Sequence, residues 1–279
     1  MTQTNTNCKI IVITSGKGGV GKTTTTANIG AGLAMKGYKV ALIDTDTGLR
    51  NLDLLLGLEN RIMYDLVDVT SGKIPYKKAL VRHKKYETLF LLPTSQTKDK
   101  LAVSPEQVVA LCSEMSADFD FILIDCPAGI EQGFKTAVAA ADIALVVTMP
   151  EISAVRDADK IIGELNRADK ENILLIVNRI RPDMVAKGEM LDLDDINDIL
   201  AIKCIGQIPD DEMVVSSTNR GEPVIANTKS QAGIAYQNIT RRLCGEDVPF
   251  MTFRTKESFF DRLKKIILIK ESIILCLRL

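Results

Sequence analysis

Residues 16–23 read Gly16-Lys17-Gly18-Gly19-Val20-Gly21-Lys22-Thr23. This segment matches G-x-x-x-x-G-K-[ST] at every fixed position, the pattern of a phosphate-binding P-loop. It carries a further lysine, Lys17, directly after the first glycine. The general pattern predicts a nucleoside triphosphate as ligand. A second ammonium group on the same loop needs an explanation beyond that pattern.

The flanking sequence supplies the context that the pattern requires. Cys8–Thr14 is a β-branched apolar run typical of a buried parallel strand, and Thr24–Met35 has small and apolar residues at helical spacing. Glycines let backbone N–H groups turn around an anion, and a helix N-terminus adds partial positive charge. We expect Lys22 to reach the β- and γ-phosphates and Thr23 to ligate Mg²⁺. The alternative is a glycine-rich turn without a ligand. The expected nucleotide-binding residues of the loop are Gly16, Lys17, Gly18, Gly19, Val20, Gly21, Lys22, Thr23 and Thr24.

Strand-like and helix-like segments alternate along the chain. The expected strands are Cys8–Thr14, Lys39–Ile43, Thr88–Leu92, Phe121–Ile124, Ile143–Thr148, Ile173–Val177 and Cys204–Ile208. The expected helices include Thr23–Lys36, Pro105–Met115, Gly133–Ala141, Ser153–Asn166 and Leu193–Leu200. This alternation predicts an α/β fold, with a mostly parallel, doubly wound sheet of the P-loop NTPase type and a C-terminal amphipathic helix. We divide the chain into a disordered N-terminus (1–7), a P-loop domain (8–245), a linker (246–257) and an amphipathic tail (258–279).

Acidic residues follow two of the expected strands. Asp44 and Asp46 come after the second strand, and Asp125 follows the strand at 121–124. The carboxyl ends of parallel strands face the crevice in which open α/β sheets bind ligands. We expect Asp44 and Asp125 to hold the Mg²⁺ shell and Asp46 to orient an attacking water. Gly129 could donate its backbone N–H to the γ-phosphate. Each carboxylate alone has the alternative of being a strand-end cap or turn former.

Two further strand ends are candidates for binding the base. Asn178 follows the strand at 173–177, and its carboxamide can offer donors and an acceptor to a purine edge. The Pro209-Asp210 turn follows the next strand and could close over the base. The alternative is that both are ordinary loop turns.

Composition excludes several other classes. The chain has 279 residues and a net charge of −1, which gives the whole molecule no electrostatic case for nucleic acid. Its six cysteines form no C-x-x-C pair, so they indicate reduced thiols and neither a disulfide framework nor a zinc site. The one histidine, His83, is expected to be solvated in a loop. The N-terminus MTQTNTN resembles no secretion signal, and no run of 18 apolar residues predicts a membrane span.

The C-terminal tail differs from the rest of the chain. Residues 254–279 carry seven Lys or Arg and three acidic residues, a net charge of +4 that leaves −5 on the remainder. In a helix, one face would present Phe259, Phe260, Leu263, Ile266 and Ile267, and the other face basic residues that include Lys264 and Lys265. Such a helix is typical of an in-plane anchor on anionic lipid. The alternatives are a helix packed on its own domain and a partner-binding helix.

Together these motifs carry a family resemblance over about residues 8–250. The loop KGGVGKT, with its extra lysine, resembles the deviant Walker A (ParA/MinD) ATPases and, among them, the septum-placing ATPases of cyanobacteria and chloroplasts. Further stretches that carry the resemblance are Gly48–Asp53, Leu92–Thr97, Asp125–Glu131, Pro150–Asp157, Val177–Pro182 and Asn219–Val224.

The resemblance implies a Mg²⁺-dependent ATP hydrolase that acts as a homodimer. Two monomers would meet face to face over ATP, and Lys17 would reach the phosphates of the opposite subunit as an arginine finger does. Lys17, Lys22 and Asp46 would then be the catalytic residues. Hydrolysis, stimulated by a MinE-like activator, would separate the dimer, and a MinC-like inhibitor, where present, would bind it.

The resemblance also implies a peripheral location on anionic membrane lipid, without a specific nucleic acid partner. In a plastid-encoded protein this would be the chloroplast stroma and inner envelope, and otherwise the cytoplasmic face of a bacterial inner membrane. Because dimerisation supplies a second tail helix, ATP would control membrane residence through avidity.

Rival classes share the same loop. A DNA-partitioning ATPase would need a basic surface on a domain that is net negative. A nitrogenase-type iron protein would need a second suitably placed cysteine besides Cys126, and an iron–sulfur carrier would usually have a C-x-x-C. A non-enzymatic switch, in which ATP binding alone drives dimerisation, stays open.

Overall fold

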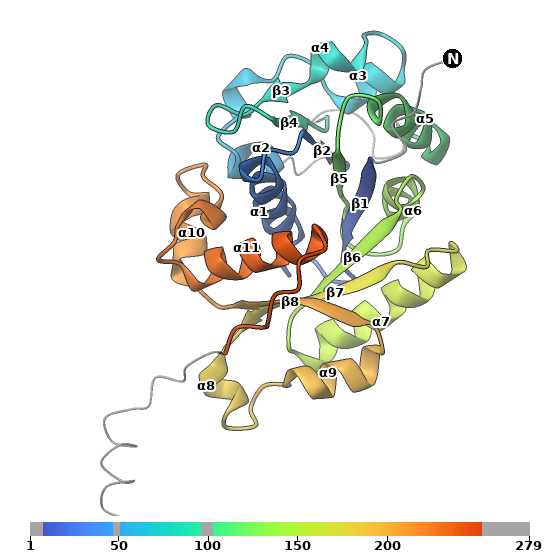
Figure 1. Ribbon diagram of the computed structural model, residues 1–279. Helices are drawn as coiled ribbons and strands as arrows, with labels where there is room; N and C mark the ends of the chain where they lie inside the picture. Colours follow the sequence, from blue (N-terminus) through green and yellow to red (C-terminus); the bar gives the residue numbers. More distant parts are fainter. Residues whose placement is uncertain (1–7, 47–50, 96–102, 253–279) are drawn as a thin grey trace, which may run out of the picture.

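The computed structural model describes residues 8–46, 51–95 and 103–252. Within these residues, eight strands form one sheet in the order β3-β4-β2-β5-β1-β6-β7-β8, with every pair parallel except β3–β4. The strands are β1 (Lys9–Thr14), β2 (Val40–Asp44), β3 (Val81–Arg82), β4 (Leu89–Leu92), β5 (Phe121–Asp125), β6 (Ile143–Thr148), β7 (Ile173–Ile180) and β8 (Lys203–Pro209). The central strand β1 therefore carries the P-loop at its carboxyl end, next to the ends of β5 and β6 (Figure 1).

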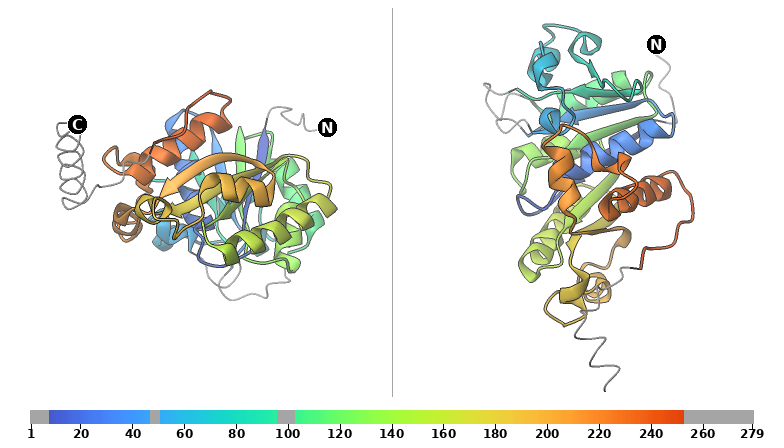
Figure 2. Two further views of the ribbon diagram at one scale, coloured as in Figure 1. Left: turned by 90° about the horizontal axis from the view of Figure 1, so that it is seen from below. Right: turned by 90° about the vertical axis from the view of Figure 1, so that its left-hand side faces the viewer.

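Helices cover both faces of the sheet (Figures 1 and 2). They are α1 (Lys22–Met35), α2 (Leu52–Leu55), α3 (Leu66–Thr70), α4 (Tyr76–Ala79), α5 (Pro105–Met115), α6 (Gln132–Val138), α7 (Ile152–Arg167), α8 (Pro182–Val185), α9 (Leu193–Leu200), α10 (Glu212–Thr218) and α11 (Gln231–Leu243), with short 3₁₀ turns at Glu59–Arg61 and Val224–Ala226. Because side chains alternate along a strand, Val12 joins the core under α5, α6, α7 and α9, whereas Ile11 and Ile13 join the core under α1 and α11.

The expected doubly wound α/β fold is confirmed. The expected strand at 143–148 and the expected helices at 105–115 and 193–200 have the bounds that the structure gives them. Seven helices and strands of the described residues have no counterpart among the expected segments named above: β3, α2, α3, α4, α8, α10 and α11. Strand β7 is three residues longer than expected, so Asn178 lies within it and does not end it.

His83 is not solvated, contrary to expectation. The residue is buried and its Nδ1 accepts hydrogen bonds from the backbone N–H groups of Lys85 and Tyr86, both at 3.1 Å. Its ring stacks on that of Tyr86 at 4.9 Å. Burial and nearby cationic side chains lower the pKa of His83 to about 4. The five cysteines in the described part of the chain are free thiols.

The segment after α11 packs on the domain as far as the structure describes it. The Arg242 guanidinium donates hydrogen bonds to the carbonyls of Val248 and Pro249, both at 2.9 Å, and lies 4.3 Å from the Phe250 ring. The tail residues expected to contact membrane, 259–267, lie outside the described residues, as do residues 1–7. No helix in the described part of the chain is long and apolar enough to span a membrane.

Candidate nucleotide site

The P-loop joins β1 to α1 in a conformation that depends on glycine. Gly19 and Gly21 have φ of 78° and 100°, in the left-handed region that other residues avoid. A Cβ added at Gly18 or Gly19 would meet no atom within 4 Å, so the space on this side of the loop is open. At Gly16 a Cβ would lie 2.2 Å from the backbone oxygen of Asp157, because the start of the loop packs against α7. The loop is therefore packed against α7 at its start and open to a ligand at Gly18 and Gly19.

Lys22 begins α1 and lies at the bottom of this loop. Its side chain is buried, and its Nζ donates a hydrogen bond to Ser15 Oγ at 3.0 Å. Ser15 Oγ in turn donates to the Lys17 carbonyl at 2.8 Å. A buried ammonium beside a helix N-terminus is a strong attractor for phosphate oxygens.

The two expected metal-binding carboxylates lie side by side at the ends of adjacent strands. Asp44 on β2 is the register partner of Asp125 on β5, and both are 1% exposed. Thr26 Oγ1 donates to Asp125 Oδ1 at 3.1 Å. Burial raises the pKa of Asp125 to about 6, and burial together with the Asp125 charge raises that of Asp44 well above its usual range. A bound cation would offset both effects, so this pair, with the Thr23 hydroxyl, fits Mg²⁺.

A cavity of about 420 Å³ lies over the loop. Asp46 lines it, and the Asp46 backbone N–H donates to Asp44 Oδ1 at 2.9 Å, which ties the cavity wall to the carboxylate pair. Other expected site residues on its wall are Gly18, Gly19, Gly21, Lys22, Thr23 and Thr24. Residues that the sequence analysis did not select are Asn51, Leu54, Leu55, Ala128, Arg179 and Thr218. Of these, Ala128 is the chain neighbour of Gly129 and Arg179 is that of Asn178, two residues with an expected role in binding.

Gly129 and Asn178 make contacts other than those expected with a ligand. The Gly129 N–H donates to the Ser15 carbonyl at 3.3 Å, and its φ is 94°. The Asn178 carboxamide donates to the Val20 carbonyl at 2.7 Å and accepts from the Arg179 N–H at 2.9 Å. Asn178 thus supports the P-loop from β7. Its role in base binding stays a prediction, as does the γ-phosphate contact of Gly129.

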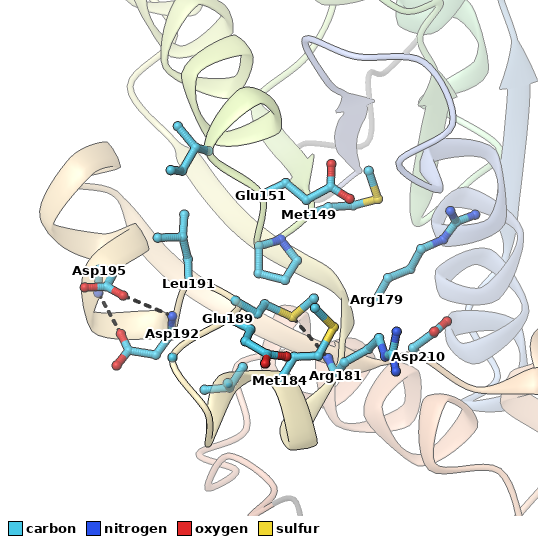
Figure 3. Close-up of a pocket in the computed structure, with 15 residues that line it drawn as sticks. Met149, Glu151, Arg179, Arg181, Met184, Glu189, Leu191, Asp192, Asp195 and Asp210 are labelled. Atoms are coloured by element: carbon cyan, nitrogen blue, oxygen red, sulfur yellow. Dashed lines mark hydrogen bonds between the residues drawn. The ribbon is translucent and has the colours of Figure 1, made fainter.

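Pro209 and Asp210 lie at the end of β8. Pro209 is the register partner of Ile180, and the Asp210 N–H donates to the Ile180 carbonyl at 2.9 Å. Asp210 and Arg179 both line a second cavity of about 720 Å³, drawn in Figure 3. Arg179 has a φ of 57° and borders both cavities, so it lies between the loop and the β7–β8 strand ends.

The Lys17 side chain makes its contacts at the start of α7. Its Nζ lies 3.4 Å from Glu151 Oε2 and 3.4 Å from Ser153 Oγ. The two side chains of the ion pair are 41% and 51% exposed. Within this single chain, Lys17 is therefore held at the surface beside the site, where an exposed ion pair contributes little stability.

The fold and this site define a P-loop nucleotide-binding protein. The model of the CobQ/CobB/MinD/ParA nucleotide binding domain matches residues 11–224. The chain is 55% identical over 246 residues to the septum site-determining protein MinD of Synechocystis, which covers 88% of this chain and 92% of that protein. The chain belongs to this family and, within it, to the MinD proteins.

Solved structures agree. The MinC:MinD cell division protein complex of Aquifex aeolicus matches with a TM-score of 0.83 and 50% identity, covering 88% of this chain and 100% of that chain. MinD of Pyrococcus horikoshii, solved with Mg-ADP, matches with a TM-score of 0.76 and 29% identity, covering 85% and 96%.

Proposed function

We propose that this protein hydrolyses ATP and helps to position a division septum through an ATP-driven membrane cycle. The observation that carries the proposal is the cavity over the P-loop, in which a buried lysine, a threonine hydroxyl and the Asp46 carboxylate surround one space. The membership among septum site-determining proteins supports the cellular role.

Each residue of the site has a role in this proposal. Lys22 and the loop amides bind the ATP phosphates, and Thr23 with Asp44 and Asp125 holds the Mg²⁺ shell, which neutralises phosphate charge. Asp46 orients the attacking water. Asn178, Pro209 and Asp210 form the base end of the site. Asn178 would do so while its amide also supports the Val20 carbonyl.

Dimerisation gives Lys17 its role. Its ion pair with Glu151 is exposed and weak, so Lys17 can exchange this partner for the phosphates of a second subunit at little cost. ATP bound between two subunits would then be neutralised by Lys22 in cis and Lys17 in trans. We propose that a MinE-like activator promotes hydrolysis and that a MinC-like inhibitor binds the ATP dimer.

In this proposal the tail makes membrane binding depend on whether the protein carries ATP. One amphipathic basic helix binds anionic lipid weakly, whereas two helices on a dimer gain avidity without new contacts. We therefore propose a peripheral location, on the plastid inner envelope in a plastid-encoded protein and on the cytoplasmic face of the inner membrane in a bacterium.

Co-sedimentation with anionic vesicles tests this function. The full chain should pellet with ATP and Mg²⁺ more than with ADP, and a chain ending at Thr255 should remain in the supernatant in both. A Phe260→Glu variant should behave as the truncated chain does. Vesicle binding by the truncated chain would contradict the tail as membrane anchor. Retention of the full chain on DNA under the same conditions would favour the DNA-partitioning alternative. Phosphate release measured in the same samples separates an enzyme from a pure ATP switch.

A further inference from the structure

The second cavity is a groove between the start of α7 and the α8–α9 segment. Its volume of about 720 Å³ is in the range of clefts that bind ligands. Figure 3 shows Met149 and Glu151 on one side of it, with Met184 and Glu189 on the other. The groove shares Arg179 with the cavity over the P-loop, and it is also lined by Asp210, which the proposed function assigns to the base end of the nucleotide site.

Part of the lining of this groove is apolar. Met149, Met184, Met190 and Leu191 line it, and Ile152 at its edge is 61% exposed. Methionine side chains adapt to irregular apolar partners, and they recur in grooves that accept the apolar face of a helix. An amphipathic helix with large apolar residues fits this chemistry.

The rim of the groove is acidic. Five acidic residues line it against two basic ones, Arg179 and Arg181, and Arg181 lies 3.4 Å from Asp183, outside the lining. The acidic residues are Glu151, Glu189, Asp192, Asp195 and Asp210. A basic partner is therefore favoured over an acidic one.

The chain itself carries such a partner close by. The C-terminal end of the described chain lies next to α8 in the views of Figures 1 and 2. Residues 253–279 follow, and the six residues 253–258 can span about 20 Å when extended. The +4 tail with its stripe of Phe259, Phe260 and Leu263 matches the groove in charge and in apolar character.

We propose that, in the monomer without ATP, the amphipathic tail docks in this groove of its own chain, with its apolar stripe on the methionines and its basic face on the acidic rim. Docking removes the same apolar face that would enter a membrane. The groove also borders the nucleotide machinery, because Glu151 pairs with Lys17 and Arg179 lines both cavities. Rearrangement of these two residues in the ATP dimer would weaken the groove and release the tail. This regulation rests on the membrane role proposed above.

Photocrosslinking of the full chain tests docking directly. Phe260 is replaced by p-benzoylphenylalanine, and the protein is irradiated at low concentration without nucleotide or lipid. We expect crosslinks within one chain, mapped by mass spectrometry to residues 184–191. Glu189→Lys should lower their yield about threefold or more. The matched control is Asp198→Lys, which changes an exposed acidic residue of α9 outside the groove and should leave the yield unchanged. Crosslinks between two chains, crosslinks elsewhere on the domain or no crosslinks would overturn the proposal.

A vesicle arm separates this proposal from the membrane role. Without nucleotide, Glu189→Lys should raise the fraction of full chain bound to anionic vesicles about threefold relative to Asp198→Lys, since the tail is no longer sequestered. Equal binding by the two variants would contradict autoinhibition. If no variant binds vesicles under any condition, the membrane role fails, while the crosslinks still decide whether the tail docks.

Discussion

Asp125 illustrates how a residue of the site lowers the stability of the nucleotide-free protein. The side chain is 1% exposed, and its pKa is raised to about 6 because burial disfavours its charge. At pH 7 the carboxylate is nevertheless largely ionised, next to Asp44. Such electrostatic destabilisation is expected at a binding site where a bound cation supplies the compensating positive charge.

The first prediction follows from this unfavourable burial of the Asp125 carboxylate. Asp125→Asn should raise the free energy of unfolding of the nucleotide-free protein at pH 7 by about 1–3 kcal/mol, since a neutral amide avoids the buried charge. It should also abolish the additional stabilisation by Mg²⁺ and nucleotide. Denaturant unfolding with and without Mg-ADP measures both effects, with the exposed Asp198→Asn as control. A destabilised variant that still responds to Mg-ADP would contradict this account of the pair.

His83 predicts a pH dependence of stability. Its pKa in the folded protein is about 4, below the value of about 6.5 for an unfolded chain. As pH falls from 7 to 5, the unfolded state takes up a proton that the folded state excludes, so stability decreases over this range. Wild type should lose about 1–2 kcal/mol more than His83→Asn between these two pH values, by denaturant unfolding. Equal losses would mean that the His83 pKa is not lowered.

At the scale of elements, two glycines, Gly57 after α2 and Gly221 after α10, allow the backbones of these two segments to approach closely. A Cβ on Gly221, where φ is 65°, would lie 2.7 Å from Gly57 Cα. Leu54 and Leu55 of α2 and Thr218 of α10 line the nucleotide cavity next to this contact. The close approach of the two backbones therefore lies beside two segments that line the cavity.

Gly221→Ala should thus affect both stability and nucleotide binding. We expect a loss of about 2–4 kcal/mol, from backbone strain together with the clash. Gly72→Ala is the matched control, because Gly72 has a φ of 74° but no atom within 4 Å of an added Cβ, so only the backbone strain of about 1 kcal/mol applies. Denaturant unfolding and titration with a fluorescent nucleotide compare the two. Similar losses of stability in Gly221→Ala and Gly72→Ala would mean that the close contact between Gly221 and Gly57 is not the cause.

The helices and strands of the fold show what the sequence could predict. Apolar runs and the loop pattern predicted the strands of the parallel sheet, because strands buried on both faces are continuously apolar. They also brought Asp44 and Asp125 to one edge, since parallel strands end together. Helix α2 was missed because it has only four residues, and α11 because it carries polar and small residues among its apolar ones.

The orientation of side chains within the site was harder to predict. Asn178 lies within β7, where the register with β8 shifts between Val177 and Ile180 and Arg179 adopts a positive φ. No local pattern encodes such an irregularity. The cavity wall formed by Leu54 and Thr218 arises from a contact between segments far apart in the chain, which a single sequence does not reveal.

At the scale of the whole molecule, the P-loop and the second cavity both lie at the carboxyl ends of strands, the loop after β1 and the cavity after β6, β7 and β8. Lys17 and Glu151 connect these two sites, because Lys17 belongs to the P-loop, Glu151 lines the groove, and the two side chains form an ion pair. If Lys17 leaves Glu151 for another partner, both the P-loop and the groove change. In the proposed cycle, dimerisation rather than nucleotide binding alone is therefore the step that releases the tail.

Lys17→Ala tests that step. Because the Lys17–Glu151 pair is half exposed on both sides, its loss should change the free energy of unfolding by less than about 1 kcal/mol. Nucleotide affinity of the monomer should also change little, since Lys22 and the loop amides remain. With a non-hydrolysable ATP analogue and Mg²⁺, however, light scattering should find wild type as a dimer and Lys17→Ala as a monomer. Glu151→Gln is the control, because it frees Lys17 without removing it, and it should dimerise at least as well as wild type. Dimerisation of Lys17→Ala at wild-type concentrations would mean that the second lysine of the loop does not act across the subunit interface.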